Sequence, residues 1–204
     1  MKLLIISGTP KQDGICHSLV TAAAETAQKL GADTQVIKIA ELKLKSCQMC
    51  ADGWGICFSE HRCEFGDKDG FNDLQNKFRD ADAFVFITPV YWGEVSEELK
   101  NFFDKLRRSQ ATKQWNKNDV GQSFMIGKPS ILVASAGGGG GGIVTTLQQM
   151  ERAITHMGGD AWPRDKSGIY DYIAVNRWNK DYKREALIAA VSSLVNNFDK
   201  EAIA

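Results

Sequence analysis

The chain has 204 residues, of which 43% are hydrophobic and 25% are charged, a balance typical of a soluble globular domain. Its 25 basic and 25 acidic residues cancel, so no net positive field is available for nucleic acid or for an anionic membrane surface. The apolar runs are too short to cross a bilayer, and the length suits one sizeable core, so we expect a single domain.

The N-terminus passes directly from Met1 and Lys2 into an apolar run at 3–7, without the charged region and cleavage site of a signal peptide. We therefore expect a cytoplasmic protein in a reducing compartment. In such a compartment, cysteines are thiols or metal ligands more often than structural disulfides.

Short apolar runs alternate with longer amphipathic segments along the chain. The pattern predicts strands at 3–7, 34–39, 83–88 and 130–134, and helices at 17–30, 71–79, 96–108, 143–156 and 181–198. A fifth strand is expected within 161–175, where Pro163 and Gly168 interrupt the pattern. The polar residues 109–128 predict a surface loop.

Alternating strands and helices predict an α/β fold, in which a doubly wound parallel sheet has helices on both faces. In such sheets, ligands bind outside the carboxyl ends of the strands. Three loops leave those ends, at 8–18, 88–95 and 135–142, and we expect them to converge on one site.

The first loop, 8–18, has the sequence GTPKQDGICHS. Its hydroxyl groups, its lysine, its free backbone N–H groups and the helix that follows suit a phosphate. The loop lacks the Gly-Lys-Ser/Thr ending of a Walker loop and the Gly-x-Gly-x-x-Gly dinucleotide fingerprint. Taken alone, it is interpreted equally well as an ordinary strand-to-helix turn.

The second and third loops have unusual compositions. The second reads TPVYWG at 88–93, and a flat aromatic ligand could stack on Tyr91 or Trp92, for roughly 1 kcal/mol beyond area burial. Alternatively, these rings pack on the following helix or face a partner subunit. The third loop has six glycines, 137–142, which let a ligand approach the backbone closely. Its length is that of an ordinary connection rather than of a flexible linker.

Four of the five cysteines lie within 17 residues, at Cys47, Cys50, Cys57 and Cys63. A thiol cluster close to a ligand loop suggests metal or electron-transfer chemistry. Four thiolates in a flexible loop can close around a [4Fe–4S] cluster or around a structural zinc ion. They are equally consistent with reduced thiols at a subunit interface.

Two of these motifs carry a family resemblance. The sequence GTPKxxG at 8–14 resembles the phosphate loop of the NAD(P)H-dependent FMN reductases of flavodoxin-like fold. The sequence TPVYWG at 88–93, followed by LKxFxDxL at 99–106, resembles their Pro-Val-Tyr-Phe/Trp-Gly loop and the helix after it. The intervening cysteines are similar to those of the iron–sulfur flavoprotein branch, and the resemblance covers residues 2 to about 160.

The resemblance implies a flavodoxin-like three-layer sandwich with a five-stranded parallel sheet in the order 2-1-3-4-5. It also implies bound FMN, NAD(P)H as the reductant, a small-molecule or ferredoxin-like electron partner, and a homodimer or higher homo-oligomer. The flavin would supply the chemistry, so no catalytic side chain is named. Two alternatives stay open: a ferredoxin-linked iron–sulfur flavoprotein that ignores nicotinamide, and a non-enzymatic redox sensor or zinc-stabilised binding module.

Carried over position by position, the resemblance implies that Thr9 and Lys11 hold the FMN phosphate. Cys16 stands where a phosphate-binding Thr or Ser is usual, so His17 or Ser18 would substitute for it. The residues expected to border the isoalloxazine ring are Pro89, Val90, Tyr91, Trp92 and Gly93 on one edge, and Ala136, Gly137, Gly138 and Gly139 on the other.

The cysteine spacing departs from that of the iron–sulfur branch, which has Cys-x2-Cys-x2-Cys and a fourth cysteine shortly after. Here Gly53 occupies the usual third position, and Cys57 is displaced by four residues. The candidate metal ligands are Cys47, Cys50, Cys57 and Cys63.

Overall fold

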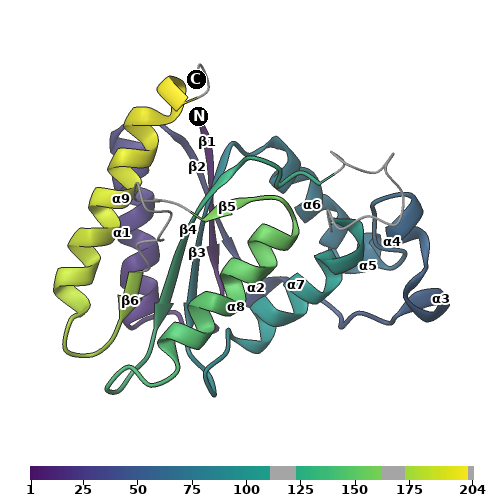
Figure 1. Ribbon diagram of the computed structural model, residues 1–204, viewed down its shortest axis with the longest axis horizontal. Coiled ribbons are helices and arrows are strands. Elements are labelled where there is room, and N and C mark those ends of the chain that lie inside the picture. The colour runs from purple at the N-terminus through teal and green to yellow at the C-terminus, as the bar shows by residue number, and fades with distance from the viewer. Residues whose placement is uncertain (111–122, 162–172, 202–204) are drawn as a thin grey trace.

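The computed structural model describes residues 1–110, 123–161 and 173–201, which form a parallel sheet between two layers of helices (Figure 1). The strands are β1 (Lys2–Ser7), β2 (Asp33–Lys38), β3 (Ala83–Pro89), β4 (Pro129–Ser135), β5 (Asp160–Ala161) and β6 (Ile173–Val175). The helices are α1 (Ile15–Lys29), α2 (Ile39–Leu42), α3 (Cys50–Gly53), α4 (Ile56–Ser59), α5 (Gly66–Asp69), α6 (Phe71–Asp80), α7 (Glu97–Ser109), α8 (Ile143–His156) and α9 (Lys180–Glu201). None of the described helices is both long and apolar enough to span a membrane.

The sheet confirms the predicted flavodoxin-like order. Its strands run β2-β1-β3-β4-β5, and every pairing is parallel. One fifth strand was expected beside β4, but two short strands, β5 and β6, both pair in parallel with β4. Pro163 and Gly168 lie outside the described residues.

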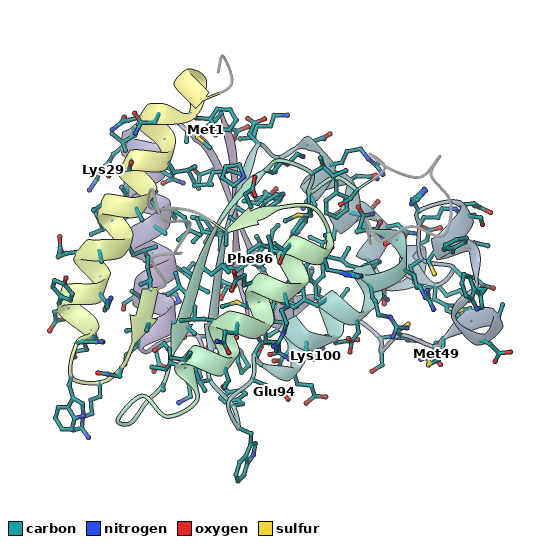
Figure 2. The ribbon with its side chains drawn as sticks, in the orientation of Figure 1. Met1, Lys29, Met49, Phe86, Glu94 and Lys100 are labelled. Carbon is teal, nitrogen blue, oxygen red and sulfur yellow. The ribbon has the colours of Figure 1, made fainter. Side chains whose placement is uncertain are left out.

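The core has two halves, one on each face of the sheet. Helices α1 and α9 cover one face, and α6, α7 and α8 cover the other (Figure 1). Along β3, Val85 and Ile87 belong to the half under α1, whereas Phe84 and Phe86 belong to the opposite half. Phe86 accordingly lies at the centre of the molecule (Figure 2). A strand that is buried on both faces must be apolar throughout, which accounts for the uninterrupted pattern of β3.

Helix α7 begins and packs as its sequence predicts. The Ser96 hydroxyl accepts a hydrogen bond from the Leu99 N–H at 3.3 Å, so Ser96 is the N-cap residue. Leu99, Phe102 and Leu106 recur at helical spacing and are fully buried. Lys105, on the same side of the helix, is also buried, which this apolar stripe did not predict.

The surface loop expected at 109–128 needs correction at both of its described ends. Gln110, Phe124 and Met125 are buried. The Gln110 side-chain oxygen accepts a hydrogen bond from the Phe124 N–H at 3.0 Å, which joins the two ends of the segment. Residues 111–122 lie outside the described part of the chain.

Candidate functional site

The three predicted loops begin side by side at the carboxyl edge of the sheet. The Gly8 N–H donates to the Ile87 carbonyl at 2.8 Å, which fixes the first loop against the end of β3. The Val90 N–H donates to the Ser135 carbonyl at 2.9 Å, which fixes the second loop against the end of β4. The convergence expected of a parallel sheet is therefore present.

The first loop leaves the N-terminus of α1 without a side-chain cap. The N-cap residue is Gly14, and the first turn of α1 has no acidic residue. The Thr9 hydroxyl accepts a hydrogen bond from the Lys11 N–H at 3.3 Å, so both side chains belong to one short turn. The exposed Lys11 side chain has no partner among the described residues. Free N–H groups, the helix dipole and a nearby ammonium fit a phosphate.

The three side chains after Gly14 differ in their availability to a ligand. Cys16 is buried, and burial raises the pKa of its thiol to about 11, with a hydrogen bond from Ser135 opposing the rise. The Ser18 hydroxyl donates to the Ile15 carbonyl at 2.8 Å. His17 has no side-chain partner within the described residues. Of the two predicted substitutes, His17 is therefore the more open to a phosphate.

The second loop ends in a strained hairpin. Tyr91 and Glu94 exchange two backbone hydrogen bonds of 3.0 Å, and the residues between them, Trp92 and Gly93, have φ values of 54° and 79°. Two positive φ values are the signature of a type I′ turn, which favours Asn-Gly over a bulky residue. A left-handed tryptophan costs about 1–2 kcal/mol, and the Trp92 side chain is fully exposed. Such strain is typical of ligand sites.

The phenol of Tyr91 links the second loop to the first. Its pKa is raised, mainly by burial and then by the nearby Glu98 carboxylate and Cys16 sulfur. Because Cys16 lies in the first turn of α1, the Tyr91 phenol interacts electrostatically with the helix terminus that suits a phosphate. A phosphate and an aromatic ring system could then be held by neighbouring loops.

The third loop touches the second where both backbones need glycine. Gly142 has a φ of 79°, and a Cβ atom there would lie 2.6 Å from the Cα atom of Gly93. The Thr145 hydroxyl donates to the Gly93 carbonyl at 2.7 Å. A Cβ atom at any of residues 137–139 would contact nothing within 4 Å, so this stretch is open to a ligand.

A fourth loop at the same edge was missed by the sequence analysis. The Ala136 N–H donates to the Val175 carbonyl at 2.9 Å, which places the end of β6 beside the glycine loop. Trp178 follows two residues after Asn176 and is 77% exposed. A tryptophan between a short strand and a helix was a usable signal, but the unplaced fifth strand concealed it.

The four clustered cysteines line one cavity of about 310 Å³ between their own segment and α7. Burial, then the charges of Cys47 and Cys63, raise the pKa of the Cys57 thiol, and burial, then Glu64, raise that of Cys50. The volume and the soft donors suit a thiolate-bound centre. The arrangement of the four thiols does not suit such a centre, because no three potential ligands within the described residues are close enough to share a metal ion.

The backbone of this cysteine segment is strained. Five of the six described non-glycine residues with positive φ lie between 43 and 61, among them Met49, Ala51 and Asp52. The segment forms α3, α4 and α5, which lie beyond α6 and α7, away from the sheet (Figure 1). Met49 accordingly appears at the far end of the molecule from the sheet (Figure 2).

The remaining charged lining of the cavity is mostly cationic. Arg108 stacks over the Trp54 ring at 4.7 Å, and its buried Nε atom has no hydrogen-bond partner in the described part of the chain. An anionic centre in the cavity would be favoured by this surplus of positive charge. The charged side chains of the lining are Lys45, Lys68, Lys105, Arg107, Arg108 and Glu64.

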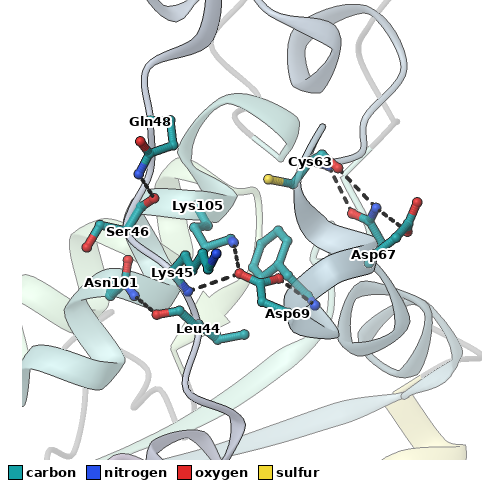
Figure 3. Close-up of polar contacts among 11 residues, drawn as sticks. Leu44, Lys45, Ser46, Gln48, Cys63, Asp67, Asp69, Asn101 and Lys105 are labelled. Atoms are coloured by element: carbon teal, nitrogen blue, oxygen red, sulfur yellow. Dashed lines mark hydrogen bonds and ion pairs between the residues drawn. The ribbon is translucent and has the colours of Figure 1, made fainter.

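A buried ion pair joins the cysteine segment to α7 (Figure 3). The Lys105 Nζ atom lies 2.5 Å from the Asp69 carboxylate, and both side chains are nearly inaccessible. Asp69 also accepts hydrogen bonds from the N–H groups of Lys45 at 3.0 Å and Phe71 at 3.2 Å. The residues just before and just after the cysteines are thus held by one carboxylate.

The fold and the converging loops define an α/β protein of the flavodoxin-like class with a candidate ligand site at the carboxyl edge of its sheet. The chain belongs to the NADPH-dependent FMN reductase family, which it matches over residues 1–164. The expected family is thereby confirmed.

Proteins of two archaea are related in sequence. An iron-sulfur flavoprotein of Methanosarcina thermophila is 31% identical over 130 residues, which cover 62% of this chain and 63% of that protein. An iron-sulfur flavoprotein of Methanocaldococcus jannaschii is 31% identical over 127 residues, which cover 62% of each chain. The match therefore spans less than two thirds of these curated relatives.

Solved structures share the fold at lower identity. An NAD(P)H:quinone oxidoreductase from Methanothermobacter marburgensis is similar with a TM-score of 0.65 and 14% identity, over 97% of this chain and 96% of that chain. An azoreductase from Bacillus anthracis is similar with a TM-score of 0.68 and 13% identity, over 97% of this chain and 99% of that chain. These likenesses establish the flavodoxin-like fold.

Proposed function

We propose that this protein is an FMN-dependent oxidoreductase that moves electrons from NAD(P)H through bound FMN to an acceptor. The convergence of the first three loops is the observation that supports the proposal. One edge of the sheet combines an uncapped helix terminus, a strained aromatic hairpin and an open glycine backbone. A single phosphate cradle favours FMN over FAD.

The residues of this site would bind and orient the cofactor. Thr9, Lys11 and the first turn of α1 would hold the phosphate, with His17 in place of the usual hydroxyl. Residues 89–93 and 136–139 would border the isoalloxazine ring and limit the access of water to it. When bound, FMN would supply the redox chemistry by accepting a hydride and passing electrons on.

The test of the flavin site is Lys11→Ala, assayed by the quenching of FMN fluorescence on binding. Loss of a charge-assisted phosphate contact should weaken FMN binding by about 1.5–3 kcal/mol, or roughly ten- to a hundredfold. Lys29→Ala is the matched control, because Lys29 is exposed at the C-terminal end of α1, whereas Lys11 precedes the N-terminal end of this helix (Figure 2). An unchanged dissociation constant for Lys11→Ala, or a cofactor that chromatographs as FAD, would refute the assignment.

We also propose that Cys47, Cys50, Cys57 and Cys63 ligate one metal centre. The shared cavity supports this, and two relatives are named iron-sulfur flavoproteins. Because no three ligands within the described residues are close enough to share a metal ion, the cysteine segment would have to close around the centre as it binds. Each thiolate would supply one of four bonds, so any single change to Ala should remove or severely weaken the centre. The raised thiol pKa values mean that metal binding must displace protons.

The five single Cys→Ala variants, prepared anaerobically, test this proposal through their metal, acid-labile sulfide and flavin contents. Cys16→Ala is the control, because this cysteine belongs to α1 and should not affect the metal centre. Iron with sulfide indicates a cluster, and zinc without sulfide indicates a structural site. The proposal fails if wild-type protein supplied with iron and sulfide binds less than a stoichiometric amount of any metal.

A homodimer is the expected assembly. The surface that would form the dimer interface has a groove of about 590 Å³ between α7 and α8. This groove is partly lined by Phe103, Ala153 and Met157. Sedimentation should then give twice the 22.5 kDa chain mass. Turnover with NADH, NADPH and a reduced ferredoxin would identify the electron donor and would separate the nicotinamide-dependent function from the ferredoxin-linked alternative.

A further inference from the structure

The loop between β6 and α9 and the first turns of α9 present two exposed aromatic rings. Trp178 is 77% exposed and Tyr182 is 73% exposed, and they are four residues apart. Each ring is paired with a cation. The Arg177 guanidinium lies 5.4 Å from the Trp178 ring, and the Lys183 ammonium lies 5.7 Å from the Tyr182 ring. Aromatic faces with adjacent positive charges suit a ligand that is both planar and anionic.

The exposure of Trp178 is built into the loop. The Asn176 side-chain oxygen accepts the N–H groups of Trp178 at 2.8 Å and Asn179 at 3.0 Å. In return, the Asn179 side chain accepts the Asn176 N–H at 2.7 Å and donates to the Ala174 carbonyl at 3.1 Å. Four hydrogen bonds therefore fix the backbone that presents the indole, and little ordering remains for a ligand to impose.

This loop lies beside the proposed flavin edge. Strand β6 pairs in parallel with β4 and ends with Val175 opposite Ser135. The Asn176 amide lies 3.3 Å from where a Cβ atom of Gly140 would be. A dinucleotide whose nicotinamide faces the glycine backbone at 137–139 would thus have its other half within reach of the fourth loop.

The local charge favours a phosphate-bearing ligand over a second copy of the chain. Residues 177–185 contain four basic and two acidic side chains. A two-fold interface through this surface would bring the same cations face to face, which opposes association. The stacked base and diphosphate of a nucleotide would instead match both the rings and the charge.

We propose that Trp178, Tyr182 and Arg177 form the subsite for the adenylate half of the nicotinamide dinucleotide. The subsite rests on the proposed function, because it supplies the second contact of the NAD(P)H that would reduce the flavin. Trp178 stacks on the base, and Arg177 pairs with the diphosphate.

Calorimetric titration of the FMN-loaded protein with ADP tests the subsite without any redox step. Trp178→Ala should weaken ADP binding by about two- to tenfold, whereas Trp178→Phe should keep most of the affinity because a stacking face remains. In steady-state assays, Trp178→Ala should raise the KM for the dinucleotide by a similar factor and leave kcat unchanged. Reduced nicotinamide mononucleotide, which lacks the adenylate, should show no difference between wild type and variant.

Three results would overturn the subsite: no ADP binding by wild-type protein in the millimolar range, equal ADP affinities for wild type and Trp178→Ala, or a variant that loses only its self-association. Failure of the proposed function has a different signature, because wild-type protein would then bind no FMN or would not oxidise even the mononucleotide. In that case, ADP binding that depends on Trp178 would support an adenylate site at Trp178 and would overturn its assignment to the nicotinamide dinucleotide.

Discussion

Lys105→Met probes the contact that joins the cysteine segment to the rest of the molecule. The Lys105 and Asp69 side chains are only 2% and 4% exposed. Removing one partner of a buried ion pair typically costs 3–5 kcal/mol, because the remaining charge stays buried. Asp69 keeps two backbone N–H donors, from Lys45 and Phe71, so we expect the lower end, about 3 kcal/mol of unfolding free energy.

Urea denaturation measures this loss, and α7 offers a matched control. Lys100 pairs with Asp104 at 2.6 Å on the same helix, but these side chains are 43% and 46% exposed, so Lys100→Met should cost below about 1 kcal/mol. The double variant Lys105→Met/Asp69→Asn leaves no buried charge, should recover most of the stability, and provides the measurement if the single variant does not fold. Equal losses for Lys105→Met and Lys100→Met would refute the reasoning.

Three further changes test other parts of the structure. Gly142→Ala should weaken FMN binding and destabilise the fold by more than about 1 kcal/mol, because the φ of Gly142 is 79° and the new methyl group would meet the facing loop. Gly141→Ala is the control in the same titration and unfolding assays, because its methyl group would contact nothing. The Cys16 thiol has a pKa of about 11 in the folded protein against an ordinary 9.0, so the unfolded chain ionises first. Stability should therefore fall as the pH rises from below 9 to above 11, by about 2.7 kcal/mol in total. Cys16→Ser should lack this part of the pH dependence in unfolding experiments, and identical profiles would contradict the assignment. Ser96→Ala should lower the unfolding free energy by about 1 kcal/mol through loss of the α7 cap, and an unchanged denaturation midpoint would show that the cap contributes nothing.

The sequence predicts the elements whose pattern is long and local. Strand β3 is apolar over its whole length, and α8 has a clear helical stripe, so both were placed to within a residue. Strands β5 and β6 have two and three residues, which is too short for an alternating pattern to show. Because these strands were not placed, the sequence analysis did not identify the loop that follows β6, or Trp178 within it.

Contacts between distant residues could not be predicted in the same way. The rule for parallel sheets predicts that loops 88–95 and 135–142 meet, but it does not show that Gly93 and Gly142 touch. Similarly, Lys105 reads as a polar interruption of an apolar stripe, because its partner Asp69 is 36 residues away and in another element. Tertiary pairing, and not propensity, decided that a charged side chain is buried there.

Helix α7 connects the proposed flavin edge to the cysteine cavity. Its N-cap, Ser96, donates its N–H to the hydroxyl of Thr88, near the end of β3, at 3.1 Å, whereas Lys105 lies at the cavity. The eight residue-to-residue steps from Glu97 to Lys105 correspond to about 12 Å along the helix axis. Because both points of α7 are held by buried hydrogen bonds, the fold sets the position of the thiols relative to the flavin edge. Loss of Lys105 should therefore speed the reaction of the four thiols with a disulfide reagent while leaving the affinity for FMN unchanged, and a parallel loss of FMN binding would show that the two sites are not separately held.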